Sequence, residues 1–102
     1  MGFTFLYVTV KDKAEARRIS THLLQLKLIA CANIFPVDSM YWWKGKIMEG
    51  KELVLILKTL KNKVVAVRKE IEKIHSYEVP CITEIMVRLN EKYGKWMERQ
   101  MR

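Results

Sequence analysis

The sequence contains few of the residues that cross-link or interrupt a chain: two cysteines, two prolines and four glycines among 102 residues. Cys31 and Cys81 stand apart, outside any CxxC pair, so neither a zinc knuckle nor a disulfide framework is predicted. No stretch approaches the roughly 20 uninterrupted apolar residues of a membrane helix, and the N-terminus lacks the pattern of a secretion signal. We therefore expect a reduced cytoplasmic protein that does not bind membranes.

The sequence also has few acidic residues relative to basic ones: 11 Asp and Glu stand against 19 Lys and Arg, a net charge of +8. This excess could attract an anionic partner. The basic residues are nevertheless scattered through every segment and accompanied by glutamate, with no dense basic run, which favours a solvated surface.

Motifs of common enzyme classes are missing as well. The sequence contains no GxSxG, no P-loop and no HExxH. Its carboxylates are isolated on predicted helices and turns rather than paired. We therefore expect a protein that is not an enzyme.

The first half of the chain predicts a strand, a helix and a long hairpin. Residues 4–10 are β-branched and aromatic, as in a strand. Asp12 can cap a helix that ends near Lys27, with Glu15 at the capping-box spacing. Residues 28–41 resume strand character, interrupted at Pro36 and at Asp38 and Ser39, so a bend, bulge or edge position is expected. The pair Lys44 and Gly45 suits a tight hairpin turn. One helical stripe holds Ala16, Ile19, Leu23 and Leu26.

The second half repeats this order. Residues 53–57 are continuously apolar, residues 82–87 form another strand, and a helical stripe lies between them. Asn90 is placed to cap a terminal helix. The order βαββαβ predicts an α+β, ferredoxin-like fold with an antiparallel sheet in the order 4-1-3-2, both main helices on one face and a C-terminal helix. The second stripe holds Val64, Val67, Ile71 and Ile74, and the terminal helix carries Tyr93, Trp96, Met97 and Met101.

Both faces of this predicted sheet are apolar. In residues 4–10, Phe5 and Tyr7 share one face, while Leu6 and Val8 share the other. In residues 53–57 leucines alternate with Val54 and Ile56. The strands of an antiparallel sheet with one solvent-exposed face alternate apolar and polar residues. Monomeric proteins seldom expose large apolar patches. We therefore expect other subunits to cover the second face.

Four segments identify a family. They are residues 29–34 (IACANI), 41–46 (YWWKGK), 52–59 (ELVLILKT) and 75–80 (HSYEVP). Together they closely resemble the CutA family of divalent-ion tolerance proteins. The resemblance implies a single CutA-like domain over residues 1–102, assembled as a homotrimer around a threefold axis. It also implies a role in tolerance of, or response to, divalent metals such as copper.

The family resemblance further places Glu52, Lys58 and His75 near clefts between subunits. Similarity to the trimeric PII signalling proteins suggests a sensor that binds a metal or small ligand there, by fold-level analogy. Tyr77 and Pro80 are retained from the family pattern, so the turn between them is expected to keep its shape. Lys58 and Thr59 could close an ion pair and cap the following helix, with a structural role favoured for Thr59.

The largest apolar cluster is Tyr41, Trp42 and Trp43. Such residues suit an interface because they bury a large area and keep a polar group, so we expect them to anchor the hairpin and the subunit contact. A ligand-stacking platform is the alternative.

A metal site, if present, would use His75 and Cys81. In the family, metal binding is attributed to a cysteine near the end of the first strand and to a histidine pair at the end of the second helix. Here these places hold Val8 and the pair Ile74 and His75. The predicted topology puts Cys31 at the opposite edge, whereas Cys81 opens the neighbouring strand. An imidazole together with a thiolate suits copper or zinc. The alternative is that neither residue binds a metal: Cys81 is then a small buried apolar residue, and His75 ends a helix, where the helix dipole favours it.

A nucleic-acid-binding module is the alternative function, because the RNA-recognition motif has the same βαββαβ order and the chain is basic. That motif stacks bases on aromatics of its first and third strands. Residues 53–57 contain no aromatic residue, so we do not expect nucleic-acid binding.

Overall fold

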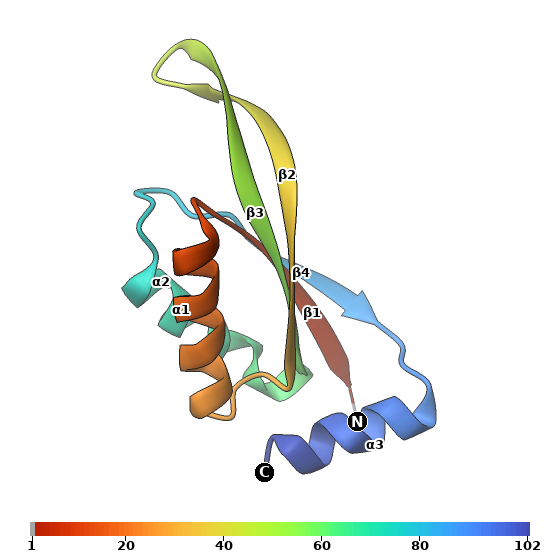
Figure 1. The fold of residues 1–102 in the computed structure, drawn as a ribbon. Coiled ribbons are helices and arrows are strands. Elements are labelled where there is room, and N and C mark those ends of the chain that lie inside the picture. Colours follow the sequence, from red (N-terminus) through yellow and green to blue (C-terminus); the bar gives the residue numbers. More distant parts are fainter. Residues whose placement is uncertain (1) are drawn as a thin grey trace.

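The computed structural model describes residues 2–102, and its element order is the predicted one (Figure 1). The strands are β1 (Phe3–Val10), β2 (Cys31–Trp43), β3 (Lys46–Leu60) and β4 (Ile82–Val87). The helices are α1 (Lys13–Gln25), α2 (Val64–Ile74) and α3 (Glu91–Gln100), with a 3-10 turn at Lys61–Lys63 before α2. The ferredoxin-like prediction is confirmed. No helix among the described residues is long and apolar enough to cross a membrane.

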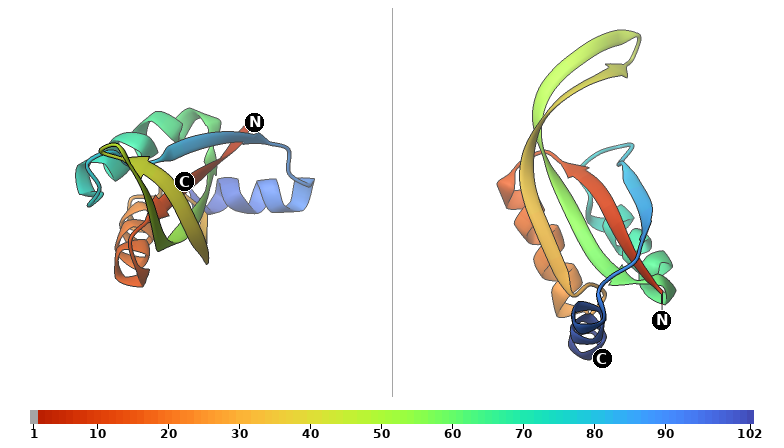
Figure 2. Two further views of the ribbon diagram at one scale, coloured as in Figure 1. Left: turned by 90° about the horizontal axis from the view of Figure 1, so that it is seen from above. Right: turned by 90° about the vertical axis from the view of Figure 1, so that its right-hand side faces the viewer.

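The four strands form one antiparallel sheet in the order β2-β3-β1-β4, as predicted. Both α1 and α2 lie against one face of it (Figures 1 and 2). The core forms there because alternate β1 residues face the helices, and Leu6 and Val8 are fully buried together with Leu55 and Leu57 of β3. The helices contribute the stripes expected from the sequence, among them Ile19, Leu23, Val67 and Ile71.

The ends of α1 show why its stripe is shorter than predicted. Asp12 caps the helix, because its Oδ1 accepts the backbone N–H of Glu15 at 2.8 Å. The helix ends at Gln25, and Lys27 adopts a left-handed φ of 59°. Leu26 therefore leaves the helical stripe and is exposed, contrary to the prediction.

The second face of the sheet is covered only at one end. There α3 buries Met97 and Met101 against Leu60, with Phe3 and Tyr93 packed beside them. Trp96, expected on the same face of α3, is 37% exposed. Asn90 occupies the N-cap position, but its side chain makes no capping hydrogen bond.

Farther along the same face, large apolar side chains are open. Phe35 on β2 and Ile85 on β4 are each 41% exposed. Phe35 is paired in register with Val54, and Ile85 with Phe5. Because paired residues project to the same face, Phe35 and Ile85 lie on the face away from α1 and α2. The apolar second face inferred from the sequence is thus present, and α3 covers only part of it.

The hairpin of β2 and β3 extends well beyond the rest of the sheet (Figure 2). The pairing of β3 with β1 ends at Leu53, whereas its pairing with β2 continues to Lys46 opposite Trp43. We call this extension, residues 38–51, the arm. Its tip is the predicted tight turn, with positive φ at Lys44 and Gly45. Pro36 lies on an edge strand, as predicted, but β2 continues through it without interruption.

Candidate functional site

A hollow of about 820 Å³ lies between the arm and the loop that connects α2 to β4. This loop spans residues 75–81. The arm contributes the three aromatic residues singled out in the sequence, and β3 contributes Glu52 beside it. The residues that line the hollow are Thr9, Asp38, Ser39, Met40, Tyr41, Trp42, Trp43, Glu52, Ser76, Tyr77, Glu78, Val79 and Cys81.

Tyr77 and Glu52 link the two walls of the hollow. The Tyr77 hydroxyl donates a hydrogen bond to Oε2 of Glu52 at 2.6 Å. Burial raises the pKa of the Tyr77 phenol well above its usual range, and the hydrogen bond to Glu52 raises it further, since ionisation would break that bond. Tyr77 is therefore a neutral donor that fixes the Glu52 carboxylate in the hollow.

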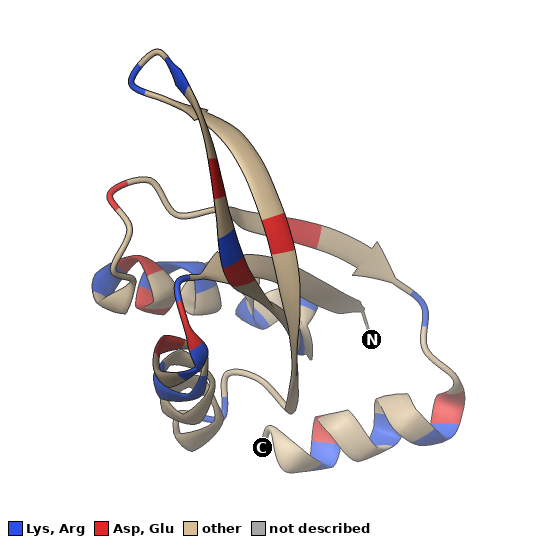
Figure 3. Cartoon of the chain, turned by 45° about the horizontal axis from the view of Figure 1, so that its top comes forward, with Lys and Arg blue, Asp and Glu red and all other residues tan. Residues whose placement is uncertain are grey.

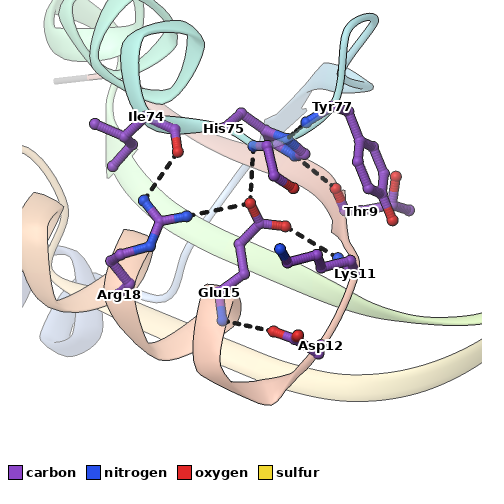
Figure 4. Close-up of polar contacts among 9 residues, drawn as sticks. Thr9, Lys11, Asp12, Glu15, Arg18, Ile74, His75 and Tyr77 are labelled. Atoms are coloured by element: carbon purple, nitrogen blue, oxygen red, sulfur yellow. Dashed lines mark hydrogen bonds and ion pairs between the residues drawn. The ribbon is translucent and has the colours of Figure 1, made fainter.

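His75 ends α2 and orients the loop with both of its ring nitrogens (Figure 4). Its Nε2 lies 2.8 Å from the carbonyl oxygen of Thr9, and Nδ1 accepts the backbone N–H of Tyr77 at 3.0 Å. Because a carbonyl only accepts, Nε2 carries the proton and the imidazole is neutral. The Tyr77 ring lies beside it, with 4.8 Å between ring centroids.

Glu15 at the start of α1 holds the same loop from the other side (Figure 4). Its Oε2 accepts the Ser76 backbone N–H at 2.8 Å, and its Oε1 accepts the Lys11 backbone N–H at 3.1 Å. Arg18 donates to Glu15 at 3.2 Å and to the Ile74 carbonyl at 2.9 Å. Burial favours a higher pKa for Glu15, but the hydrogen bonds from Ser76 and Lys11 outweigh it, so the pKa is lowered.

This role of Glu15 was not found in the sequence. The spacing of Asp12 and Glu15 predicted a capping box, in which Glu15 would bond back to the Asp12 backbone. The carboxylate instead binds Lys11 and the distant Ser76. Asp38 and Glu78 of the hollow were also missed, since nothing in their local sequence distinguishes them from solvated surface carboxylates.

The proposed metal ligands do not share the hollow. Cys81 is exposed and lines it, with its Sγ 3.5 Å from the Thr83 hydroxyl. His75 is not among the lining residues, and both of its ring nitrogens have partners. Within residues 2–102, no group of three or more His, Cys, Asp or Glu side chains is arranged to hold a metal ion. The side chains of one chain thus provide no preformed metal site.

Cys31 lies far along the sheet from His75, as the predicted topology required. Cys31 is paired with Lys58, which is paired in turn with Phe5, whereas His75 contacts Thr9 at the other end of β1.

Lys58 also lies outside the hollow, on the second face of the sheet. Its Nζ is 5.4 Å from the Phe5 ring centroid and 5.2 Å from that of Tyr93, whose hydroxyl accepts from it at 3.4 Å. Thr59 points to the opposite face, where its hydroxyl donates to the Leu28 carbonyl at 2.6 Å. It therefore ties β3 to the start of β2 and does not cap the following helix.

The fold, the arm and the 75–81 loop are shared with proteins of known family. A sequence model described as "CutA1 divalent ion tolerance protein" matches residues 4–100. The divalent-cation tolerance protein CutA of Thermococcus kodakarensis is 44% identical over 100 residues, which are 97% of this chain and 96% of that protein.

Solved structures agree with the sequence comparison. A CutA structure from Archaeoglobus fulgidus, described as a periplasmic divalent cation tolerance protein, has a TM-score of 0.95 at 40% identity, covering 98% of this chain and 99% of its own. CutA1 from Oryza sativa has a TM-score of 0.95 at 33% identity, covering 100% and 95%.

The architecture is that of an α+β ferredoxin-like protein whose long hairpin overhangs a ligand-sized hollow. The chain belongs to the CutA1 family of divalent ion tolerance proteins. The family description refers to tolerance of ions and names no reaction.

Proposed function

We propose that this protein is a non-enzymatic homotrimer that responds to divalent metals, copper among them, and binds a metal or small ligand in clefts that its arms help to wall, in the manner of PII proteins. The observation that carries the proposal is the arm itself. It extends beyond its own sheet, carries large exposed apolar side chains and overhangs a hollow of about 820 Å³.

Apolar exposure on the arm supports self-association. Met40 is 70% exposed, Trp42 71% and Ile47 61%, and the second face adds Phe35 and Ile85. Soluble monomers rarely display contiguous apolar patches above a few hundred Å², so these side chains require a partner. A second and third copy of the chain provide one, because each brings an equally uncovered sheet face.

Metal binding by His75 and Cys81 has less support from the structure of one chain than self-association has. If His75 bound a metal, one of its two hydrogen bonds would be lost, at a net cost of about 0.5–1.5 kcal/mol. Cys81 would have to leave Thr83 and be joined by ligands from elsewhere, since two side chains alone make a weak site. The residues present do not fit a preformed site, and the proposed pair requires a direct binding test.

Two measurements test this function. One chain has a mass of 12.1 kDa. Sedimentation equilibrium at micromolar concentration should give three times this mass. A monomer would refute the proposed assembly. Calorimetric titration with Cu(I), Cu(II) and Zn(II) should show binding that weakens in a His75→Ala/Cys81→Ala variant.

The chain supplies a matched control for the metal titration, since it has just one other histidine and one other cysteine. A His22→Ala/Cys31→Ala variant removes the same functional groups away from the loop. Equal affinity in both double variants and the unmodified protein would eliminate His75 and Cys81 as the metal site.

The nucleic-acid alternative has little support on β3, although Phe5 and Tyr7 of β1 lie on the same face of the sheet. The β3 side chains on the second face include Val54, Ile56 and Lys58, with no aromatic residue for base stacking. RNA binding that survived 200 mM salt would reopen it, because nonspecific attraction weakens steeply with salt. A cytoplasmic location remains part of the proposal and is supported by two free cysteines, Cys31 and Cys81.

A further inference from the structure

The charge of the hollow is opposite to that of the protein. Three carboxylates line it: Asp38 from β2, Glu52 from β3 and Glu78 from the 75–81 loop. None of the 19 Lys and Arg residues of the chain is among its lining residues, although the net charge is +8. Figure 3 shows acidic positions on both strands of the hairpin and on the loop, and basic positions at the tip of the arm and between acidic positions of one strand. The lining of the hollow is therefore acidic, with Lys51 next to it as the cross-strand partner of Asp38.

Aromatic residues of the arm line the same hollow. Tyr41, Trp42 and Trp43 line the hollow, and Trp42 is the most exposed of them. Ring faces carry negative electrostatic potential and attract cations within about 6 Å of the ring centroid. The arm already contains one such contact, because the ammonium of Lys44 lies 5.8 Å from the Trp43 centroid without lining the hollow.

The carboxylate nearest the base of the arm is held in position. Glu52 accepts the Tyr77 hydroxyl through one oxygen, and a carboxylate offers about four acceptor sites. Acceptor capacity therefore remains for a donor placed inside the hollow. Ser39 of the arm and Ser76 of the loop also line the hollow and add two small polar residues.

A bare metal ion does not match this arrangement. Hard divalent cations require about six oxygen ligands close together, and no group of three acidic, His or Cys side chains within residues 2–102 is clustered for that purpose. The volume of about 820 Å³ lies instead in the usual range of small-molecule sites, roughly 300–1,000 Å³. Dispersed carboxylates and aromatic faces suit a larger cation whose charge is spread over an organic group.

We propose that this hollow binds an organic cation, an ammonium or guanidinium group attached to an apolar body, with the arm aromatics against the cation and Asp38, Glu52 and Glu78 supplying the opposing charge. This inference rests on the proposed function, in which the arms help to wall a ligand-binding cleft, and it names the class of ligand that binds there. The aromatic cluster then serves as a ligand platform as well as an apolar surface.

Three probes with one ring and different charges test the proposal: benzyltrimethylammonium, benzyl alcohol and benzoate. Each is titrated into the full-length protein at constant ionic strength, with binding followed by calorimetry and tryptophan fluorescence. The cation should bind roughly tenfold more tightly than benzyl alcohol, and benzoate more weakly than both.

Variants locate the binding. Asp38→Asn/Glu52→Gln/Glu78→Gln should reduce affinity for the cation by roughly tenfold and leave benzyl alcohol unchanged, since it removes charge and little volume. Trp42→Leu should reduce affinity for the cation by roughly fivefold. The matched control is Glu84→Gln/Glu91→Gln/Glu98→Gln, which removes three carboxylates outside the lining of the hollow and should leave all three affinities unchanged. Sedimentation measures the assembly of each variant, and affinities are compared at protein concentrations where Trp42→Leu has the same oligomeric state as the unmodified protein.

Two results would overturn the proposal: equal affinity for all three probes, or undiminished cation binding in the acidic-residue variant when the control also binds normally. These outcomes are distinct from failure of the proposed function. A monomer that still selects the cation would refute the trimer alone, whereas a trimer that binds Cu(I) at His75 and shows no charge selection would refute this inference alone.

Discussion

Glu15 and Ser76 are 61 positions apart in the sequence, yet Oε2 of Glu15 accepts the backbone N–H of Ser76 at 2.8 Å. This contact joins the first turn of α1 to the loop that forms one wall of the hollow. Arg18 strengthens the junction by binding both Glu15 and the last carbonyl of α2, that of Ile74. Polar contacts therefore tie the loop to α1.

Replacing Glu15 by Gln should destabilise the protein and change its response to acid. The pKa of Glu15 is lowered on folding from an ordinary value of 4.5, so the unfolded state binds more protons in that range. The stabilisation is complete above about pH 4.5 and is lost as pH falls through the lower folded value. At neutral pH, Glu15→Gln should cost about 1.5–3 kcal/mol, since hydrogen bonds to a charged group are removed.

Urea unfolding between pH 3 and 7 at one protein concentration measures this effect. Glu91→Gln provides the control, because Glu91 is an exposed partner of Lys95 at 2.8 Å and should contribute little to stability. If the free energy of unfolding falls as steeply with decreasing pH in Glu15→Gln as in the unmodified protein, Glu15 is not the source of this acid sensitivity.

Tyr77 should remain a neutral phenol where an ordinary tyrosine ionises. Its pKa is raised above the usual 10.0 by burial and by the hydrogen bond to Glu52. A raised folded pKa means that this stabilisation is present below pH 10 and declines as pH rises toward the folded value. Phenolate absorbance between pH 10 and 11 should therefore be the same in Tyr77→Phe as in the unmodified protein. If the phenolate absorbance of Tyr77→Phe were lower by the contribution of one tyrosine, Tyr77 would ionise as an ordinary tyrosine does.

Thr59→Val should lower the free energy of unfolding by about 1–3 kcal/mol, since it leaves the Leu28 carbonyl without its donor. The two side chains have similar shape, so the loss reports the hydrogen bond. Thr59 is fully buried, and Thr59→Ser keeps the hydroxyl and serves as the control. The prediction fails if Thr59→Val is as stable as the unmodified protein in urea.

Gly94→Ala should destabilise the packing of α3, although alanine favours a helix over glycine by about 1 kcal/mol. A Cβ at position 94 would lie 2.8 Å from Cζ of Phe3. Hydrogen exchange of the α3 amides should therefore accelerate in Gly94→Ala. The smaller side chain of Phe3→Leu should restore protection in the double variant. At Gly50 an added Cβ meets nothing within 4 Å, so Gly50→Ala is the matched control.

Local periodicity was sufficient to predict the fold. The alternation of β1 and the helical stripes determine which surfaces must be buried. The strand order followed from the element order βαββαβ, which is that of the ferredoxin-like arrangement. The site needed information that periodicity does not contain. The contact of Glu15 with Ser76 and the meeting of Asp38, Glu52 and Glu78 depend on how the arm curves over the loop, and short sequence patterns do not specify that curvature.

Resemblance directed attention to the loop but did not indicate the individual interactions within it. His75 and Tyr77 occupy the expected turn, yet both ring nitrogens of His75 are engaged in holding that turn. Lys58, which the family pattern groups with Glu52, lies beside Phe5 and Tyr93 and outside the hollow. Spacing cannot distinguish a ligand-binding imidazole from one whose role is structural.

In the proposed trimer, the arm would make the association of subunits independent of the folding of each one. Beyond Leu53 it pairs only with itself, and its large side chains contribute nothing to the core beneath α1 and α2. If copies associate as proposed, substitutions at Met40, Trp42 or Ile47 should alter how tightly they bind while the fold of each copy is preserved. Partner choice among related chains can in this way diverge without a loss of foldability.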